Sequence, residues 1–513
     1  MPPNPSVSQE ETDTTTRCGK ALSLRMMEKK RRSLVVAGIV TCSWIGSAAL
    51  GAGILTLVRV ESPQASTLAQ QLAQAGFDVQ PAADPNACEI IVSDAEMEAL
   101  RGHGLDPQVL AVGRPFRDIE TAQLSILAGP ADYPDLAQIL AELYAAQSDF
   151  PALCEVTDLT ETYGTPPTFE GRHLFALKIS DHVTEDEDEP AFLLVGAHHA
   201  REIVTPVIAL YVIEQLTRQY GVDPTITALV DEYEIWVAPV WNPDGYEYVF
   251  DTDNFWRKNR RVFAPGPGVG VDLNRNYPFG WDAACGGAAV ATSETYRGPA
   301  AASEAETQTM IAFGRDRRFA KVADLHSWAR EVRYANGCLS HPFLPFLAAE
   351  AARLAAPARY ATALSCCTGG DIQFHTADYG SHAFLWETHV SFQPSYASAR
   401  AEAKRVFPSL LALLERRIPV QGHVADAVTG QPVAATLTYL GIPFPNGETN
   451  GSDERWGRYH AFLPTGVYAL EFAAAGYQSR YCVVQVDVDG SQVLDVLMAP
   501  MVGSNSKADS SSD

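Results

Sequence analysis

The sequence predicts an α/β protein: a large central domain with a mixed, mostly parallel sheet flanked by helices, a small α/β module before it and a β-sandwich after it. Three observations lead to this prediction. Short, continuously apolar runs in the middle of the chain are typical of buried strands, and polar residues directly follow them. Helical spacing alternates with short strands before the central region, and short alternating strands separated by turn residues come after it. A chain of 513 residues is expected to form more than one domain.

The first part of the chain, residues 1–60, is expected to lie outside the folded domains. A basic run at 29–32 precedes an uncharged segment at 33–58. A basic flank before an apolar segment indicates either an uncleaved membrane anchor or a secretory signal peptide. The length favours an anchor, whereas the small residues at 48–52 and a start at Met26 or Met27 favour a signal peptide. Both alternatives place the catalytic part outside the cytoplasm, as a secreted, periplasmic or membrane-anchored protein.

A small α/β module is predicted at 63–117. Residues 66–75 have helical spacing, and 89–92 read as a short strand. Ser93 and Glu96 form a capping box, which predicts that a second helix begins directly after the strand.

The His-Ala-Arg-Glu tetrad at 199–202 indicates a metal site at the end of a buried strand. The apolar run 191–195 precedes it, and Thr205-Pro206 offers an N-cap and a first-turn proline for a helix. His199 and Glu202 therefore project from a tight strand-to-helix connection, where open α/β sheets place their chemistry. An imidazole nitrogen and a carboxylate oxygen suit zinc, and a catalytic zinc needs one more protein ligand and an open position.

Two further apolar runs supply the remaining chemistry. The run 319–325 is a second predicted strand, and His326 follows it directly. The run 384–386 is a third, and it delivers Glu387. An isolated H-x-x-E pattern recurs by chance, so these downstream residues carry the assignment. Two histidines and two glutamates at strand ends make a two-histidine, one-carboxylate zinc site with a spare carboxylate, the composition of a metallohydrolase.

Several short motifs follow one another in an order that is itself informative. They are His-x-x-Glu at 199–202, Asn-Pro-Asp-Gly-Tyr at 242–246, Trp-Arg-Lys-Asn-Arg at 256–260, Asp-x-Asn-Arg-Asn at 272–276, Ser-Glu-Thr-Tyr-Arg-Gly-Pro at 293–299, His-Ser at 326–327, Gly-Gly at 369–370 and Glu387. With this series the chain resembles, over about residues 130–415, the zinc carboxypeptidase family typified by pancreatic carboxypeptidases A and B. An ordered series is far more specific than a single motif. The resemblance implies a funnel-shaped α/β catalytic domain at 125–417.

The resemblance also implies a role for each matched residue. His199, Glu202 and His326 would be the ligands of one zinc ion per chain. Glu387 would be the general base, which takes a proton from the zinc-activated water and delivers it to the leaving amine. Arg257 would stabilise the negative charge of the tetrahedral intermediate.

Three residues of the Asp-x-Asn-Arg-Asn motif complete the implied site. Asp272 would accept a hydrogen bond from His199 and so orient this ligand. Asn274 and Arg275 would hold the terminal carboxylate of the substrate, because a guanidinium fork beside an amide donor grips a carboxylate well. The expected partners are therefore the C-termini of peptides or proteins, and the expected activity is that of an exopeptidase.

The specificity loop departs from the family's pattern. Counted back without gaps from Glu387, Ser365 stands where the family places a mobile lid tyrosine, and Tyr360 could replace it only if the loop carries a gap. The loss should weaken substrate closure more than the metal chemistry. The same count puts Ile372 at the base of the side-chain pocket, which favours a hydrophobic C-terminal residue. A shift of one position would place Asp371 there and reverse that preference.

The flanking parts also resemble known modules. The segment 63–117 is similar to the short module that precedes many secreted bacterial members of the family, and it is either a propeptide that covers the funnel or a structural appendage. Residues 419–500 resemble the transthyretin-like, carboxypeptidase regulatory-like domain through Gly-x-Val-x-Asp-x-x-Thr-Gly-x-Pro at 422–432. This domain carries no recognisable catalytic set and is expected to be a folding partner. Residues 501–513, rich in Ser and Asp, have too little apolar surface to fold.

Charge and cysteine content narrow the function further. A formal net charge of -24 argues against nucleic-acid binding, which needs clustered Lys and Arg. The acidic run 181–189 is most simply a solvated loop, with calcium binding as the alternative. Nine cysteines in an exported protein make disulfides plausible, and a bond from Cys338 to the pair at 366–367 would fix the specificity loop.

The leading hypothesis is therefore an exported zinc metallocarboxypeptidase that contacts a membrane only through its N-terminal segment, if that segment is uncleaved. Two alternatives stay open. One is a relative that hydrolyses cell-wall peptides or amides. The other is a non-catalytic surface-binding protein, in which the missing lid tyrosine marks decay.

Overall fold

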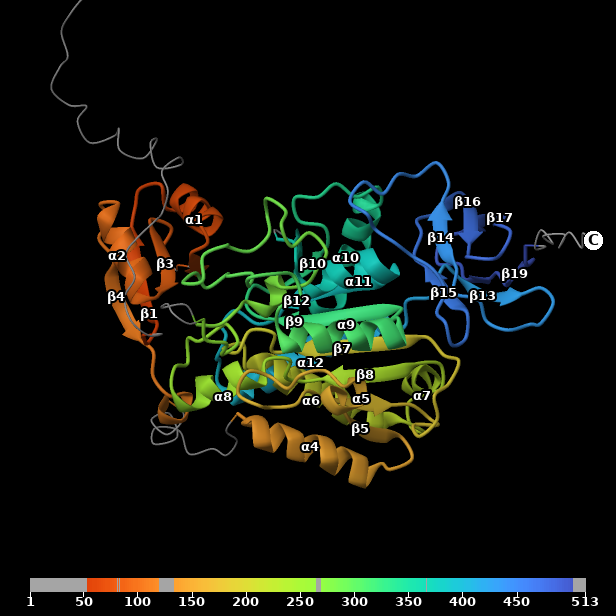
Figure 1. Cartoon of the computed structure of the whole chain (residues 1–513). Coiled ribbons are helices and arrows are strands. Elements are labelled where there is room, and N and C mark those ends of the chain that lie inside the picture. Colours follow the sequence, from red (N-terminus) through yellow and green to blue (C-terminus); the bar gives the residue numbers. More distant parts are fainter. Residues whose placement is uncertain are drawn as a thin grey trace, which may run out of the picture. The chain divides into compact units, whose positions relative to one another are not determined.

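The computed structural model describes residues 53–80, 82, 84–119, 133–263, 269–365 and 367–501. Within these ranges the chain forms a small N-terminal module, a large α/β domain and a C-terminal β-sandwich (Figure 1). Most of the predicted signal or anchor segment and nearly all of the predicted C-terminal tail lie outside the described residues. Within the described part, we find no helix with the length and apolarity that crossing a membrane would require.

The N-terminal module is a four-stranded antiparallel sheet, in the order β2-β3-β1-β4, with two helices. Its elements are β1 (Thr56–Glu61), α1 (Ala65–Gln74), β2 (Asp78–Gln80), β3 (Ala87–Val92), α2 (Asp94–Gly102) and β4 (Gln108–Val112). The predicted capping box is present, since the Ser93 side chain accepts from the Glu96 backbone N–H and the Glu96 side chain accepts in return. The boundary predicted at residue 63 is wrong. β1 begins at Thr56, inside the segment assigned to the signal or anchor, because its residues pair with β3.

The large domain is built on an eight-stranded sheet in the order β11-β10-β12-β9-β7-β8-β6-β5. The strands are β5 (Cys154–Asp158), β6 (Phe175–Ile179), β7 (Ala191–Gly196), β8 (Glu234–Ala238), β9 (Lys321–His326), β10 (Glu331–Tyr334), β11 (Ala361–Leu364) and β12 (His382–Glu387). Four of the seven neighbouring pairs run parallel, which confirms the mixed, mostly parallel sheet.

Helices cover both faces of this sheet, because its central strands are buried on both sides. The helices are α4 (Leu136–Asp149), α5 (Leu159–Tyr163), α6 (Val204–Gln219), α7 (Pro224–Val230), α8 (Pro243–Asp251), η2 (Leu273–Arg275), α9 (Ala305–Arg317), α10 (Leu344–Ala358), α11 (Asp371–Tyr379) and α12 (Tyr396–Leu414). Alternate residues of β7 enter two different cores: Phe192 and Leu194 pack with α4, α6, α10 and α12, whereas Leu193 packs with α5, α9 and α11.

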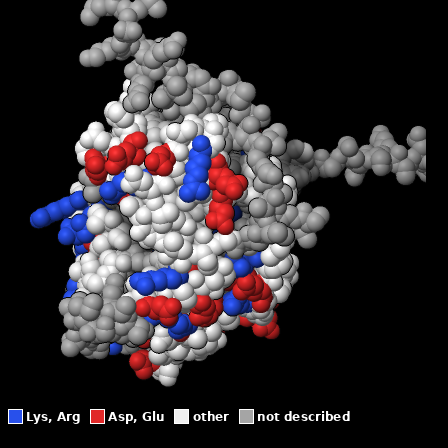
Figure 2. Space-filling model, turned by 90° about the vertical axis from the view of Figure 1, so that its left-hand side faces the viewer, with Lys and Arg blue, Asp and Glu red and all other residues white. Residues whose placement is uncertain are grey.

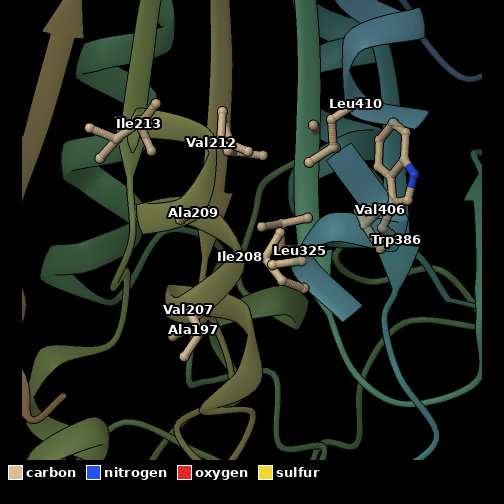
Figure 3. Close-up of a cluster of buried hydrophobic side chains, with 14 of the residues drawn as sticks. Ala197, Val207, Ile208, Ala209, Val212, Ile213, Leu325, Trp386, Val406 and Leu410 are labelled. Carbon is tan, nitrogen blue, oxygen red and sulfur yellow. The ribbon is translucent and has the colours of Figure 1, made fainter. Parts of the chain in front are cut away.

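The first of these cores holds α6 and α12 against the middle of the sheet (Figure 3). Ile208 and Val212 of α6 lie in it together with Leu325 of β9 and Trp386 of β12, and all four are buried. The strands that end at His326 and Glu387 are therefore anchored by apolar side chains one residue earlier.

The entry into α6 differs from its prediction. The helix begins at Val204, with Ile203 at the N-cap, so Thr205 lies inside the first turn instead of capping it. The Thr205 hydroxyl accepts from the backbone N–H of Ala197 and donates to the carbonyl of Glu202. It therefore stabilises the tight connection between β7 and α6 that carries the His-Ala-Arg-Glu tetrad.

The C-terminal part consists of two small sheets around one apolar core. Its strands are β13 (Val420–Asp426), β14 (Thr436–Tyr439), β15 (Arg458–Ala461), β16 (Gly466–Ala473), β17 (Arg480–Val486), β18 (Gln492–Val493) and β19 (Val496–Met498). β13 pairs with β15, β18 and β19, and β16 pairs with β14 and β17. This arrangement agrees with the predicted β-sandwich. It contacts the large domain beside α11, where Thr449 donates to the carbonyl of Ala377.

The surface carries both signs of charge. On the face drawn in Figure 2, acidic and basic side chains are interspersed, and the described residues form no continuous basic area there.

Candidate metal centre

The predicted ligands come together at the carboxyl ends of two adjacent parallel strands. His199 and Glu202 lie in the connection between β7 and α6, and His326 is the last residue of β9, which pairs with β7. All three side chains are buried. Because neighbouring parallel strands end at the same edge of a sheet, residues 127 positions apart in sequence become neighbours here.

Four potential donor atoms, from three side chains, lie close together. The Nδ1 atom of His199 lies 2.8 Å from Oε1 of Glu202 and 3.0 Å from Nδ1 of His326, and the latter lies 3.0 Å from Oε2 of Glu202. The ligands of a tetrahedral zinc stand about 3.3 Å apart, given bonds of about 2.0–2.1 Å. The spacings between the donor atoms are thus slightly shorter than in a zinc site. The donor set of two imidazoles and one carboxylate fits this metal.

Each histidine has a carboxylate behind it, which leaves Nδ1 for the metal. Nε2 of His199 lies 3.2 Å from Oδ1 of Asp272, as predicted from the motif. Nε2 of His326 lies 2.9 Å from Oδ2 of Asp324, which was not predicted. Such partners fix the tautomer and the orientation of ligating imidazoles.

Asp324 is held from a second side. Its Oδ1 lies 2.9 Å from Nδ1 of His198, and Nε2 of His198 lies 2.9 Å from the hydroxyl of Tyr277. His198 and Asp324 are both fully buried. The sequence offered one signal for this network, an aspartate within the apolar run 319–325, because a buried carboxylate requires a partner.

Arg257 also borders the centre. Its Nε and Nη2 donate to Oδ2 of Asp272 at 3.1 and 2.8 Å, and its Nη1 lies 3.9 Å from Oε1 of Glu202. Its backbone carbonyl accepts from the N–H of Ala200, inside the ligand tetrad. Asp272 therefore orients both a ligand and a guanidinium.

Glu387 is the last residue of β12 and stands in register with His326 on β9. Its Oε1 lies 3.2 Å from Nη1 of Arg333 on β10. The structure thus brings the predicted base beside the predicted ligands, and it adds an arginine that was not predicted.

Burial and neighbouring charges set the ionisation of the centre. Burial lowers the pKa of His199, and the charge of Arg257 lowers it further. Burial acts to raise the pKa of Glu202, but the adjacent histidines outweigh it and hold this pKa below its usual range. Burial raises the pKa of Glu387 against the opposing effect of Arg333.

Asn274 and Arg275, which were predicted to hold the terminal carboxylate of the substrate, lie in η2. The Asn274 side chain is bonded within the protein: Nδ2 donates to Oδ2 of Asp324 at 3.3 Å, and Oδ1 accepts from the N–H of Asp371 at 2.8 Å. Nη1 of Arg275 donates to the carbonyl of Asn274 at 2.6 Å. Asn274 thus belongs to the network behind the ligands, and Arg275 stands next to it.

The specificity loop is tied to its surroundings. The Ser365 hydroxyl accepts from Nε2 of Gln373 at 3.0 Å, and its backbone N–H donates to the carbonyl of Tyr334. Tyr360 cannot replace the lid tyrosine in this structure, because it is buried and its hydroxyl donates to Glu402 of α12.

Two further expectations for this region concern the residue at the base of the side-chain pocket and the disulfide of Cys338. Ile372 is 1% exposed and lies in an apolar core, while the carboxylate of Asp371 lies 3.4 Å from Nε2 of His375 on the same helix. The disulfide proposed between Cys338 and the specificity loop is wrong. Cys338 is bonded to Cys285 instead, because these two residues face each other across neighbouring loops.

The N-terminal module reaches residues that flank the ligands, which the sequence did not indicate. Asp78 of β2 forms a two-pronged ion pair with Arg201, the residue between Ala200 and Glu202. Gln80 accepts from the indole N–H of Trp328 at 3.1 Å, two residues after His326. Arg201 is 1% exposed.

Fold and geometry together define an α/β protein with a two-histidine, one-carboxylate metal centre and an adjacent spare glutamate. Residues 139–384 match the family model described as zinc carboxypeptidase. Zinc is the metal of the family, and the cluster of His199, Glu202 and His326 suits it.

The chain is also similar to individual carboxypeptidases. A zinc carboxypeptidase of Saccharothrix mutabilis subsp. capreolus is 32% identical over 277 residues, which cover 50% of this chain and 61% of that protein. Carboxypeptidase A1 of Rattus norvegicus is 37% identical over 34% of this chain and 41% of its own length. Carboxypeptidase B of Homo sapiens is 35% identical over 33% and 40%. The chain thus spans about two to three fifths of the relatives it matches.

Solved structures show the same fold at low identity. Carboxypeptidase A from Helicoverpa armigera superposes with a TM-score of 0.57 at 20% identity, over 70% of this chain and 96% of that chain. Thrombin activatable fibrinolysis inhibitor gives 0.58 at 20% identity, over 71% and 98%.

Proposed function

We propose that this protein is a zinc metallocarboxypeptidase, which hydrolyses the last peptide bond of peptides or proteins. The observation that carries the proposal is the convergence of three metal donors, from His199, Glu202 and His326, beside Glu387 and Arg257. A non-catalytic relative has no need to keep ligands, base and guanidinium together.

Each of these groups has a task in the hydrolysis. A zinc ion bound by the three ligands would lower the pKa of a water molecule and polarise the scissile carbonyl. Glu387 accepts a proton from the attacking water and passes it to the leaving amine. Arg257, held by Asp272, places a fixed positive charge where the carbonyl oxygen becomes negative. Burial of the site strengthens both effects by excluding water.

Arg275 is proposed to bind the terminal carboxylate, and its replacement tests the exopeptidase assignment. Arg275→Ala should lower kcat/KM for free-acid peptides by roughly 10- to 100-fold, because a hydrogen bond between charged groups is lost. Mass spectrometry of the released amino acids, with matched C-terminally amidated peptides, measures the effect. If the wild-type protein cleaves both forms equally well, or the variant leaves their ratio unchanged, the amide-hydrolase alternative replaces the carboxypeptidase.

The side-chain pocket is proposed to favour hydrophobic C-terminal residues. Ile372 lies in an apolar core, and the neighbouring Asp371 is fully buried, with its carboxylate 3.4 Å from Nε2 of His375. The side chain at the predicted base of the pocket is therefore apolar.

Export is proposed on two observations. The basic run at 29–32 before an apolar segment is typical of exported or anchored proteins. The Cys285–Cys338 disulfide supports export, because disulfides persist mainly in oxidising compartments.

The N-terminal module is proposed to restrict access to the metal centre. Its strand β2 contacts Arg201 and Trp328, each within two residues of a ligand. Further hydrogen bonds join the module to the large domain. Asp253 accepts from the N–H of Leu55, and Ser293 donates to the carbonyl of Gly76.

Weakening this contact in the full chain tests the restriction. Asp78→Asn leaves the buried Arg201 without a charged partner in the docked arrangement, which should favour release of the module. We expect kcat/KM for a peptide substrate to rise several-fold to about tenfold. Glu89→Gln, whose glutamate pairs with Arg59 inside the module, is the matched control and should leave it unchanged. Unchanged or lower activity of Asp78→Asn would identify the module as a structural appendage.

A further inference from the structure

A second arginine stands beside the proposed base. Nη1 of Arg333 lies 3.2 Å from Oε1 of Glu387. On the antiparallel pair of β10 and β12, Arg333 is opposite Leu385, two residues before Glu387. Because side chains alternate along a strand, Arg333, Leu385 and Glu387 share one face of the sheet. His326 shares it too, since it is in register with Glu387 on β9.

Arg333 is itself oriented by an acid. Its Nε and Nη2 lie 3.1 and 3.0 Å from Oε2 of Glu331, two residues earlier on β10. Two of its nitrogen atoms thus point to Glu331, and Nη1 is turned towards Glu387. The side chains of Arg333 and Glu331 are 26% and 27% exposed, and that of Glu387 is 14% exposed. The chain of contacts therefore runs from the rim of the site inwards.

The register explains why an arginine is needed at this position. Glu331 and Glu387 stand directly opposite each other on β10 and β12, and like charges in such a pair repel. Arg333 bridges them. It also gives the Glu387 carboxylate a fixed partner on the side away from Glu202, whose negative charge opposes ionisation of Glu387.

We propose that Arg333, oriented by Glu331, is a positioning residue that holds the carboxylate of Glu387 in the orientation required for proton transfer. The inference rests on the proposed carboxypeptidase function. A general base must lie within hydrogen-bond reach of the proton that it takes, and a side chain free to rotate spends much of its time elsewhere. Arg333 is expected to act on turnover, through Glu387, and not on substrate or metal binding.

Arg333→Leu tests this role. The variant should lower kcat by roughly 10- to 100-fold, the effect of losing one hydrogen bond between charged groups, while KM stays within about threefold. Zinc content should remain one per chain. Arg333→Lys, which keeps the charge, should recover part of the loss, and Glu331→Gln should lower kcat less than Arg333→Leu. Arg353→Leu is the control, since this exposed arginine pairs with Asp489 and should leave kcat unchanged.

Other outcomes overturn the inference. If Arg333→Leu keeps kcat within twofold, the guanidinium has no part in positioning the base. If it raises KM only for peptides ending in Asp or Glu, Arg333 binds the substrate side chain instead. Loss of zinc or of the cooperative thermal transition in both Arg333 variants would assign a purely structural role. If the wild-type protein itself releases no C-terminal residue, the proposed function fails, and the result is distinguishable from all of these.

Discussion

His199→Ala should abolish both zinc binding and peptidase activity. Three donor side chains, with contacts of 2.8–3.0 Å between them, form the centre, and the two that remain cannot hold zinc against water with comparable affinity. Elemental analysis should find well under one zinc per chain in the variant and one in the wild-type protein. Removal of zinc by a chelator should likewise abolish wild-type activity, and added zinc should restore it.

The chain offers a matched control for this experiment. Asp181, His182 and Glu187 also bring potential ligands together, but His182 is exposed. His182→Ala should keep one zinc and full activity. If His199→Ala kept a full equivalent of zinc and His182→Ala lost it, the metal would lie at the acidic loop. The assigned centre would then be wrong.

The ligand set could be predicted because each ligand follows a local signal. The runs at 191–195, 319–325 and 384–386 are apolar and lie within β7, β9 and β12 or within two residues of them. Neighbouring parallel strands end at the same edge of a sheet, so the residues at their ends come together. The capping box at Ser93 was predictable for the same reason, since both partners lie within four residues.

The residues that sequence reasoning missed act over long distances in the chain. Asp324 contacts His198 in the connection after β7, 126 positions away, and Asp78 pairs with Arg201 across 123 positions. The pattern identifies a polar residue in a buried strand but not its partner. The Cys285–Cys338 bond is a similar case, because cysteine spacing does not determine pairing.

Arg333 was missed for a different reason. On β10 it alternates with Val332 and Tyr334 in a strand of intermediate burial, where an arginine is ordinarily a surface residue. Only the register against β12 shows that its face is also that of Glu387.

Glu387→Gln should lower kcat by about 10²- to 10⁴-fold, the usual contribution of a general base, while one zinc remains bound per chain. Glutamine preserves the shape of the side chain and its place at the end of β12, in register with His326. The amide cannot accept the proton of the attacking water, because its nitrogen has no basic lone pair and its oxygen is far less basic than a carboxylate. Binding of the substrate, measured by calorimetry on the inactive variant, should therefore persist.

The expected separation of binding from turnover distinguishes a base from a structural glutamate. Glu214→Gln supplies the control, since Glu214 is partly exposed and pairs with Arg400 on α12, and its kcat should stay within about twofold of wild type. If Glu387→Gln retained turnover within a few-fold of the wild-type protein, another group would have to accept the proton, and Glu387 would be misassigned. If it lost zinc together with activity, Glu387 would support the metal centre instead of acting on the water.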